Sequence, residues 1–440
     1  MVRYQRRALN SRFAPIPLKR LLKKAPQYGA NEEGQERIHP EQPRYIRITD
    51  IDEYGLLRND LGATANNFEE KYKLHHNDLL IARSGATVGK AYLHKSSEVN
   101  YDCFFAGYMI RFILDDNLVN PDFVFVFTQT NTYAEWARAI QRPTGQPNIN
   151  AEEYKSLPIP LPPLEVQDRA VELFHKAYGQ KKSKESEATS LLANIDEYLL
   201  SELRVALSEP SDNNIKKRIF YRSNRQLSGE RFDAPYHSAK QPFVTKKYPL
   251  VRFADHLHIN PQTPINLPTT TEVTFLPMES ISETFGDVAT PETRPLSEAG
   301  GYTVFTENDL LWAKITPCME NGKTAMAYNL KNGFGFGSTE FNVFRLKNNN
   351  VDIRYIHGLL RMKMLRAQAK LYFGGSAGHQ RVADIFFKRL LIPLPPLQKQ
   401  IDIANMISNM MNKAKQLQHE ASEELEKAKQ EVERMILSGS

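Results

Sequence analysis

The 440-residue sequence has only two cysteines and no apolar run long enough to cross a membrane. Cys103 and Cys318 have no metal-ligand spacing, which is typical of free thiols in a reducing cytoplasm. The segment from Met1 to Lys24 is too charged for a secretory signal. Apolar residues make up 41% of the chain, which excludes a disordered protein. The net charge of +6 favours an anionic partner without identifying one.

Catalytic motifs are also missing from the sequence. No Gly-x-Gly-x-x-Gly follows a predicted strand, and residues 85–90 are one residue short of a phosphate-binding loop. The Asn-Pro-Pro-aromatic motif with which adenine methyltransferases hold their base is absent. His75-His76 and the pair His256 and His258 lack further ligands at zinc spacing. The sequence therefore favours a binding protein with no metal and no cofactor of its own.

One motif occurs twice and organises the rest of the chain. Pro160-Leu161-Pro162-Pro163-Leu164 is repeated letter for letter from Pro393 to Leu397, 233 residues later, and a glutamine follows each copy at Gln167 and Gln400. Because proline cannot donate a backbone hydrogen bond, this stretch predicts a stiff joint that ends one element and begins a helix. The alternative, a proline-rich ligand for an SH3-like groove, suits disordered tails better than a joint between two patterned segments.

Other segments repeat in the same order, which indicates a duplicated chain. The pairs are 17–21 with 249–253, 77–83 with 308–314, 109–112 with 343–346, and 145–146 with 378–380. Each copy alternates short apolar, β-branched segments with turns and then ends in a long helical pattern. We predict an α+β globular domain at residues 1–155, a central helix at 156–208, a linker and second globular domain at 209–388, and a C-terminal helix at 389–440.

The two helical segments are expected to pair antiparallel as a coiled coil. In the second helix, apolar residues from Ile407 to Met435 step by three or four with a mean of 3.5. A helix of about 44 residues spans roughly 65 Å and needs a partner along its length. The pairing residues are predicted to be Phe174, Tyr178, Leu192, Ile195 and Leu199 with Ile407, Met411, Leu417, Leu425 and Val432.

Polar and cationic side chains gather at the predicted turns of both globular domains. Arginine and lysine can read guanine, glutamine and asparagine can read adenine, and all of them can contact phosphate. Any one of these residues alone could be an ordinary solvated loop residue. The candidate DNA-binding residues are Arg47, Arg83, Lys90, Arg142, Gln146 and Asn148 in the first domain, and Lys314, Lys323, His379, Gln380 and Arg381 in the second.

Together these features resemble the specificity subunit of Type I restriction-modification systems. The resemblance rests on the repeated Pro-Leu-Pro-Pro-Leu joint with its helix, on Asn-Asp-Leu-Leu at 77–80 and 308–311, and on Gly-Glu-Arg-Phe-Asp-Ala at 229–234. It implies two target recognition domains that each read half of a split double-stranded DNA sequence, separated by the paired helices. It also implies methyltransferase subunits, two in number, docked on the helices and using S-adenosylmethionine, and translocase or nuclease subunits that join through them.

Three other readings remain open at this point. The specificity subunit of Type IIB enzymes has the same plan. A DNA-modifying enzyme with an unrecognised site is a second alternative, since a nuclease pattern can be assembled from Pro121-Asp122 and Glu153-Tyr154-Lys155. A duplicated scaffold that binds only protein is the third. The bases that are read cannot be deduced from the sequence, because loop geometry decides which side chain reaches which base edge.

Overall fold

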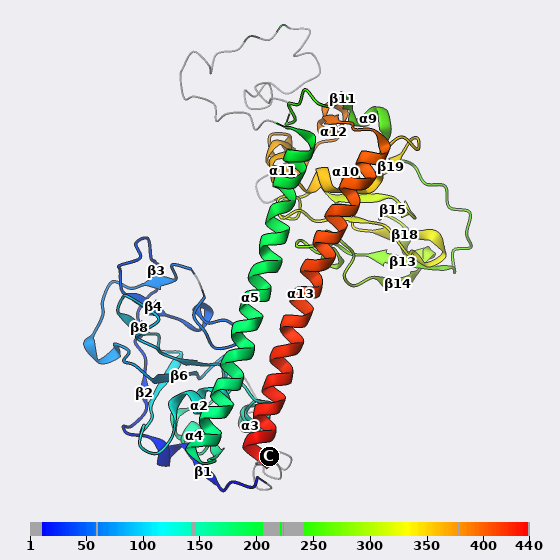
Figure 1. The fold of residues 1–440 in the computed structure, drawn as a ribbon. Helices are drawn as coiled ribbons and strands as arrows, with labels where there is room; N and C mark the ends of the chain where they lie inside the picture. Colours follow the sequence, from blue (N-terminus) through cyan, green and yellow to red (C-terminus); the bar gives the residue numbers. More distant parts are fainter. Residues whose placement is uncertain are drawn as a thin grey trace. The chain divides into compact units, whose positions relative to one another are not determined.

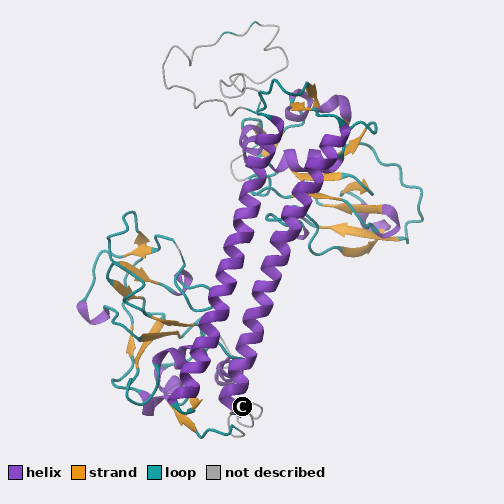
Figure 2. Cartoon of the chain, viewed as in Figure 1, coloured by secondary structure: helices purple, strands orange, loops and turns teal. Residues whose placement is uncertain are grey.

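The computed structural model describes residues 11–58, 60–141, 147–205, 221, 223, 242–375 and 379–438. The chain forms two compact units, which are described separately: Met1–Ser186 with Leu417–Ser440, and Glu187–Gln416. Each unit contains short strands, short helices and a segment of both long helices, α5 (Leu164–Leu203) and α13 (Leu397–Ser438) (Figures 1 and 2).

The first unit is organised around a four-stranded sheet of order β2-β9-β6-β7. The central strand β6 (Asp78–Ala82) is buried throughout, because Leu79 and Ile81 face one apolar cluster and Leu80 faces another. The other strands are β1 (Pro15–Pro17), β2 (Gln27–Tyr28), β3 (Gln35–Glu36), β4 (Arg44–Ile46), β5 (Ala63–Thr64), β7 (Ala91–Leu93), β8 (Cys103–Phe105), β9 (Met109–Ile113) and β10 (Pro158–Pro160). The helices are α2 (Pro121–Phe127), α3 (Asn131–Ile140) and α4 (Ala151–Lys155), with 3-10 turns η1 (Leu18–Leu21), η2 (Ile48–Asp50) and η3 (Glu70–Tyr72).

The second unit has the equivalent sheet in the order β12-β19-β16-β17, and a second sheet of order β14-β13-β18-β15. Its strands are β11 (Leu250–Arg252), β12 (Leu257–Ile259), β13 (Glu272–Leu276), β14 (Glu292–Pro295), β15 (Thr303–Thr306), β16 (Leu310–Ala313), β17 (Thr324–Met326), β18 (Phe334–Gly337), β19 (Phe341–Leu346), β20 (Phe373–Gly374), β21 (Arg381–Val382) and β22 (Leu391–Pro393). Its helices are α9 (Phe253–His256), α10 (Ile353–Arg361), α11 (Lys363–Lys370) and α12 (Ile385–Arg389), with 3-10 turns η4 (Met278–Ser280), η5 (Leu296–Ala299) and η6 (Lys331–Gly333).

The repeated Asn-Asp pair before the central strand has the same structural cause in both units. Asn77 and Asn308 adopt left-handed backbone conformations, with φ of 68° and 69°, which asparagine tolerates better than most residues. The next residue, Asp78 or Asp309, accepts the backbone N–H three residues before it, from His75 at 2.9 Å or Thr306 at 2.7 Å. Each buried aspartate also pairs with an arginine of the neighbouring strand.

Strand register corrects two of the sequence matches. β1 pairs with β10 as β11 pairs with β22, which makes Pro15 equivalent to Leu250, whereas the sequence match placed Pro17 opposite Pro249. Leu79 faces Phe112 and Leu310 faces Phe344, so the match of 109–112 with 343–346 is also displaced, by two residues. The sequence match aligned Arg111 with Arg345, the arginines that pair with the buried aspartates. By strand register, Arg345 lies two residues beyond the position equivalent to Arg111.

The repeated joint is held by its glutamine. The buried Gln167 side chain accepts the backbone N–H of Asn120, which caps α2, and donates to the Pro162 carbonyl at 2.8 Å. Gln400 repeats both bonds, with Asp352 at the start of α10 and with Pro395, and also donates to Asn350. The glutamine therefore fastens each long helix to a short helix of its own domain and to the proline joint.

We expect Gln400→Ala to lower the free energy of unfolding by at least about 2 kcal/mol, because each buried backbone group left without a partner costs about 1–3 kcal/mol. Gln398→Ala is the matched control: Gln398 lies on the same helix but is exposed and bonds only Asp402. That variant should stay within about 0.5 kcal/mol of the wild type. Equal losses for the two variants in urea unfolding would contradict the assigned role.

The two long helices run antiparallel in each unit, as predicted. In the first unit, Lys184 of α5 bonds Glu420 and Glu424 of α13, and Phe174 packs in one core with Leu425 and Val432. In the second unit, Glu202 of α5 pairs with Lys399, and Leu199 shares a core with Ile407. The predicted pairing residues are buried, except that Tyr178, Leu192 and Met411 are partly exposed. The predicted antiparallel coiled coil is therefore confirmed.

The far end of each long helix is closed by the segment that opens a globular domain. In the first unit, Ser11 donates its hydroxyl to the Ile436 carbonyl at 3.3 Å, near the end of α13. In the second, the Thr245 hydroxyl donates to the Leu203 carbonyl at 2.7 Å, at the end of α5. Since free carbonyls at a helix end need partners, these hydroxyls satisfy equivalent orphan groups.

Several local predictions need adjustment. α3 forms where a helix with an inward Trp136 was expected, and its N-cap Thr130 accepts the Tyr133 N–H. Residues 123–127, whose aromatic and β-branched composition allows either a strand or a short buried helix, belong to helix α2, because Asn120 caps it and Pro121 fits the first helical turn. The pattern of residues 44–48 predicts a strand with alternating faces; a strand, β4, forms there, but it ends at Ile46 and all three of its residues are buried, so the expected alternation is wrong. Residues 229–234 lie outside the described part of the chain.

Stability of the first unit should fall in mild acid because of His94. Burial, with His76 and His75 nearby, lowers the pKa of His94 from its usual 6.5 to about 4, and Nδ1 contacts the Tyr92 hydroxyl at 3.0 Å. Below pH 6.5 the unfolded chain binds a proton that the folded chain refuses until about pH 4. The stability lost across this window approaches about 3 kcal/mol.

Replacing His94 with asparagine removes the titrating group, so this loss between pH 6.5 and 4 should largely disappear. The measurement is urea unfolding at several pH values. His39→Asn, at an exposed position of the same unit that does not act on His94, is the control and should keep the wild-type pH profile. An unchanged acid loss in the His94 variant would assign the effect to other groups.

Candidate nucleic-acid interface

A loop edge lies at equivalent places in both units, where the central strand ends. β6 ends at Ala82 and a hairpin of residues 83–90 leads to β7, while β16 ends at Ala313 and a hairpin of residues 314–323 leads to β17. Arg83 and Lys314 are the first residues beyond these strands. Their N–H groups donate to equivalent carbonyls, of Tyr108 and Glu340, both at 2.9 Å. The two hairpins thus start from the same backbone frame.

In each unit, a second loop pairs with this edge through an isolated β-bridge. Ser84 pairs with Asn148 in the first unit, and Ile315 pairs with Arg381 in the second. The bonds from Ile149 to Arg83 (2.8 Å) and from Val382 to Lys314 (2.9 Å) fix the same register. The structure therefore brings Arg83 close to Asn148, and Lys314 close to the predicted 379–381 segment. The predicted residues Arg142 and Gln146 lie outside the described part of the chain.

The first loop edge, defined by Arg83, Tyr28, Tyr108 and Asn148, combines a cation with exposed aromatic rings. The Arg83 guanidinium lies 4.8 Å from the centre of the Tyr28 ring, a cation–π contact that helps to position it. Tyr28 is 40% exposed and Tyr108 is 68% exposed, so both rings can face a ligand. Neither tyrosine was predicted from the sequence, because an aromatic residue near a strand is more typical of a core position.

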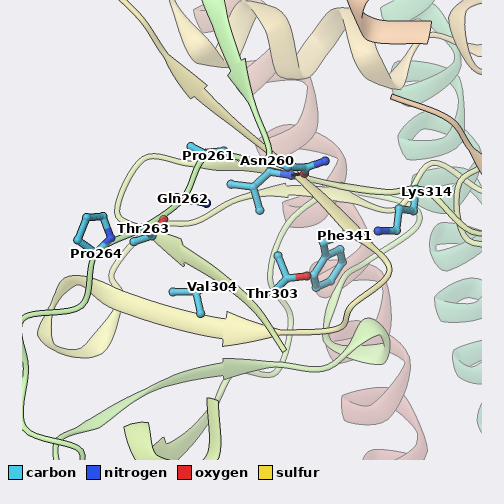
Figure 3. A pocket seen from close by; sticks show the side chains of 10 residues that line it. Asn260, Pro261, Gln262, Thr263, Pro264, Thr303, Val304, Lys314 and Phe341 are labelled. Atoms are coloured by element: carbon cyan, nitrogen blue, oxygen red, sulfur yellow. Dashed lines mark hydrogen bonds between the residues drawn. The ribbon is translucent and has the colours of Figure 1, made fainter. Parts of the chain in front are cut away.

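The second loop edge, defined by Lys314, Glu340 and residues 379–381, borders a groove of about 770 Å³. Asn260, Gln262, Thr263 and Thr303 supply polar groups to this groove, and Figure 3 shows Lys314 extending its ammonium group toward Phe341. The groove is open rather than enclosed, which suits a polymer or an extended group more than a small buried substrate. Asn260 and Gln262 were not predicted; the sequence signal is their place on either side of Pro261, directly after strand β12.

Three predicted contact residues have partners inside the protein. Lys90 and Lys323 occupy equivalent hairpin positions, and their ammonium groups donate to carbonyls of the 3-10 turn regions, Ile51 and Met278. Burial lowers the pKa of Lys90. Arg47 donates through Nε and Nη2 to the buried Asp50, and this hydrogen bond raises the pKa of Arg47. Their role in DNA contact stays a prediction, and Arg83, Asn148, Lys314 and Arg381 are better placed.

The described residues also bear on metal binding and on membrane spans. Within the described ranges, no three histidine, cysteine or carboxylate side chains gather as a metal site requires. None of the helices in these ranges has both the length and the apolar character of a membrane span.

These duplicated loop edges on a helix-linked repeat define a protein of the DNA-specificity class, and comparison with known sequences agrees. Residues 44–189 and 286–427 match the family model for the Type I restriction modification DNA specificity domain. The chain belongs to this family.

Individual relatives support the same assignment. The chain is 34% identical over 166 residues to the Type I restriction enzyme EcoEI specificity subunit of Escherichia coli, and equally to the EcoAI specificity subunit of Escherichia coli. Each alignment covers 38% of this chain and 28% of the relative. A solved structure concerned with complex assembly and conformational transition of the type I R-M system matches with a TM-score of 0.53, at 14% identity and over 97% of both chains. That likeness supports the fold.

Proposed function

We propose that this chain is the sequence-specific DNA-recognition subunit of a Type I restriction-modification complex. The observation that carries the proposal is the loop edge built twice on the same backbone frame, with a cation at Arg83 and Lys314 and an amide or guanidinium at Asn148 and Arg381. Cations supply the phosphate attraction and fixed polar groups supply base contacts. Two edges with different side chains suit a bipartite target, each reading one half.

The partners in this proposal are those that membership of the specificity family implies. Methyltransferase subunits dock on the pair α5 and α13, two per chain, bind S-adenosylmethionine and methylate adenine in each half-site. Translocase or nuclease subunits join through them in the cytoplasm. The chain itself contributes recognition and no catalytic group, which is consistent with relatives named specificity subunits.

The test compares the purified full chain with the complex of the chain and its methyltransferase partner. Alone, the chain should neither methylate nor cut DNA, and its weak DNA binding should fall steeply with salt. With the partner and S-adenosylmethionine, methylation should appear at a split sequence. Robust turnover by the pure chain would indicate an enzyme, and absence of salt-dependent DNA binding by the complex would indicate a scaffold for proteins alone.

A further inference from the structure

The two loop edges differ at their equivalent central positions. The first edge has Tyr108 and Asn148 where the second has Glu340 and Arg381, as the matched backbone bonds establish. Only the second edge therefore combines a carboxylate and a guanidinium at these positions. The contrast matters because the backbone bonds around these positions are shared, so the side chains there distinguish the two edges.

Arg381 is held rigidly by groups on two sides. Its Nε donates to Glu340 Oε2 at 2.8 Å and its Nη2 donates to Glu340 Oε1 at 2.6 Å, while Nη1 donates to the His379 carbonyl at 3.1 Å. Glu340 is only 19% exposed, and its own N–H donates to the Ser338 hydroxyl. The hydrogen bond from Arg381, with Lys314 and His379 nearby, lowers the pKa of Glu340, so the carboxylate stays charged at neutral pH.

A count of donors shows what Arg381 still offers. A guanidinium has five N–H groups, and the three bonds above use one on Nε and one on each terminal nitrogen. Among the described residues, one N–H on Nη1 and one on Nη2 therefore have no further partner. This end of the fork is the pair of donors that matches the O6 and N7 acceptors of guanine in the major groove. The side chain is 45% exposed, so the free end is accessible.

The charge of the Arg381–Glu340 pair distinguishes base reading by Arg381 from a phosphate contact. The Arg381–Glu340 pair is close to neutral as a unit, which weakens attraction to a phosphate but keeps the direction of the two free donors. Lys314, beside it, supplies the net positive charge that a phosphate contact needs.

We propose that Arg381 is a specificity-determining residue that reads a guanine in the half-site of the second domain, with Glu340 as its positioning residue. This inference rests on the proposed function. It assigns the base class at one position of one half-site and leaves the other half-site to the first loop edge.

The experiment uses the full chain in complex with its methyltransferase partner and selects bound DNA from a randomised pool. The wild-type motif should contain a guanine that Arg381→Gln makes about ten- to a hundredfold less preferred, while every other position, including the whole half-site read by the first domain, stays unchanged. Glu340→Gln should weaken the same preference. Arg294→Gln, which breaks a similar exposed pair with Glu292 on β14, is the control and should leave the motif intact.

Arg381→Lys provides the second measurement, because lysine keeps the charge and loses the fork. Binding that recovers in this variant without recovery of the guanine preference supports base reading. Equal weakening for all sequences with a smaller salt slope in Arg381→Gln, and full rescue by lysine, would overturn the proposal in favour of a phosphate contact. An unchanged motif in Arg381→Gln would overturn it as well. A wild-type complex without any sequence preference would instead refute the proposed function.

Discussion

Exchange of the first globular domain for that of another family member is expected to change one half of the methylated sequence completely and leave the other half unchanged. The reason is that each unit has its own core and its own loop edge, so the side chains that read one half-site move together. The exchanged segment should be residues 1–161. A cut at residue 155 would separate β10 from its partner strand β1.

The readout is methylome sequencing of cells that express the chimera with the methyltransferase partner. The reciprocal exchange of residues 242–394 is the matched control and should change the opposite half. If both halves change in either chimera, recognition is not divided between the domains in the way we propose.

Lengthening both long helices by seven residues is expected to widen the gap between the two half-sites by about three base pairs. Seven residues add about two helical turns and roughly 10 Å, so the apolar stripe keeps its face, and DNA rises about 3.4 Å per base pair. The insertions belong between Ser186 and Glu187 in α5 and between Gln416 and Leu417 in α13. These positions fall between the helix segments that pack within each unit.

The helical twist of DNA opposes a wider gap between the half-sites. Three additional base pairs turn the second half-site by roughly 100°, so the DNA has to twist or bend in response. We therefore expect weaker binding together with the wider gap, measured as the motif of the methylated DNA. An insertion in α5 alone is the control: it mispairs the stripe and should destabilise the protein. A soluble, active double variant with an unchanged gap would show that the helices do not set the distance between the half-sites.

The repeat and the helices could be predicted from the sequence because their causes are local. The proline joint, the following glutamine and the Asn-Asp turn each require particular residue types at fixed spacing, and the stripe from Ile407 to Met435 shows its period directly. The register of β1 and β11 could not be predicted. Strands of three residues carry too little pattern, and their alignment is decided by long-range pairing with β10 and β22.

The site residues could be predicted only where a position at a predicted turn also means that the side chain is exposed. Arg83 and Lys314 follow apolar strands directly, and the structure places both at a loop edge. Lys90 and Lys323 have the same signature in sequence, but their ammonium groups turn inward to carbonyls, which only tertiary packing decides. The pairing of Arg381 with Glu340 joins residues 41 positions apart, and no spacing rule connects them.

The closure of both long helices by Ser11 and Thr245 bears on how such a gene can change. The segment that opens each globular domain caps the helix that ends the other half of the chain. The order in which the two halves are encoded does not affect the formation of these two helix caps. A rearranged gene that encodes the second half before the first would keep both caps, and recombination between halves from different genes would combine recognition specificities without a new fold.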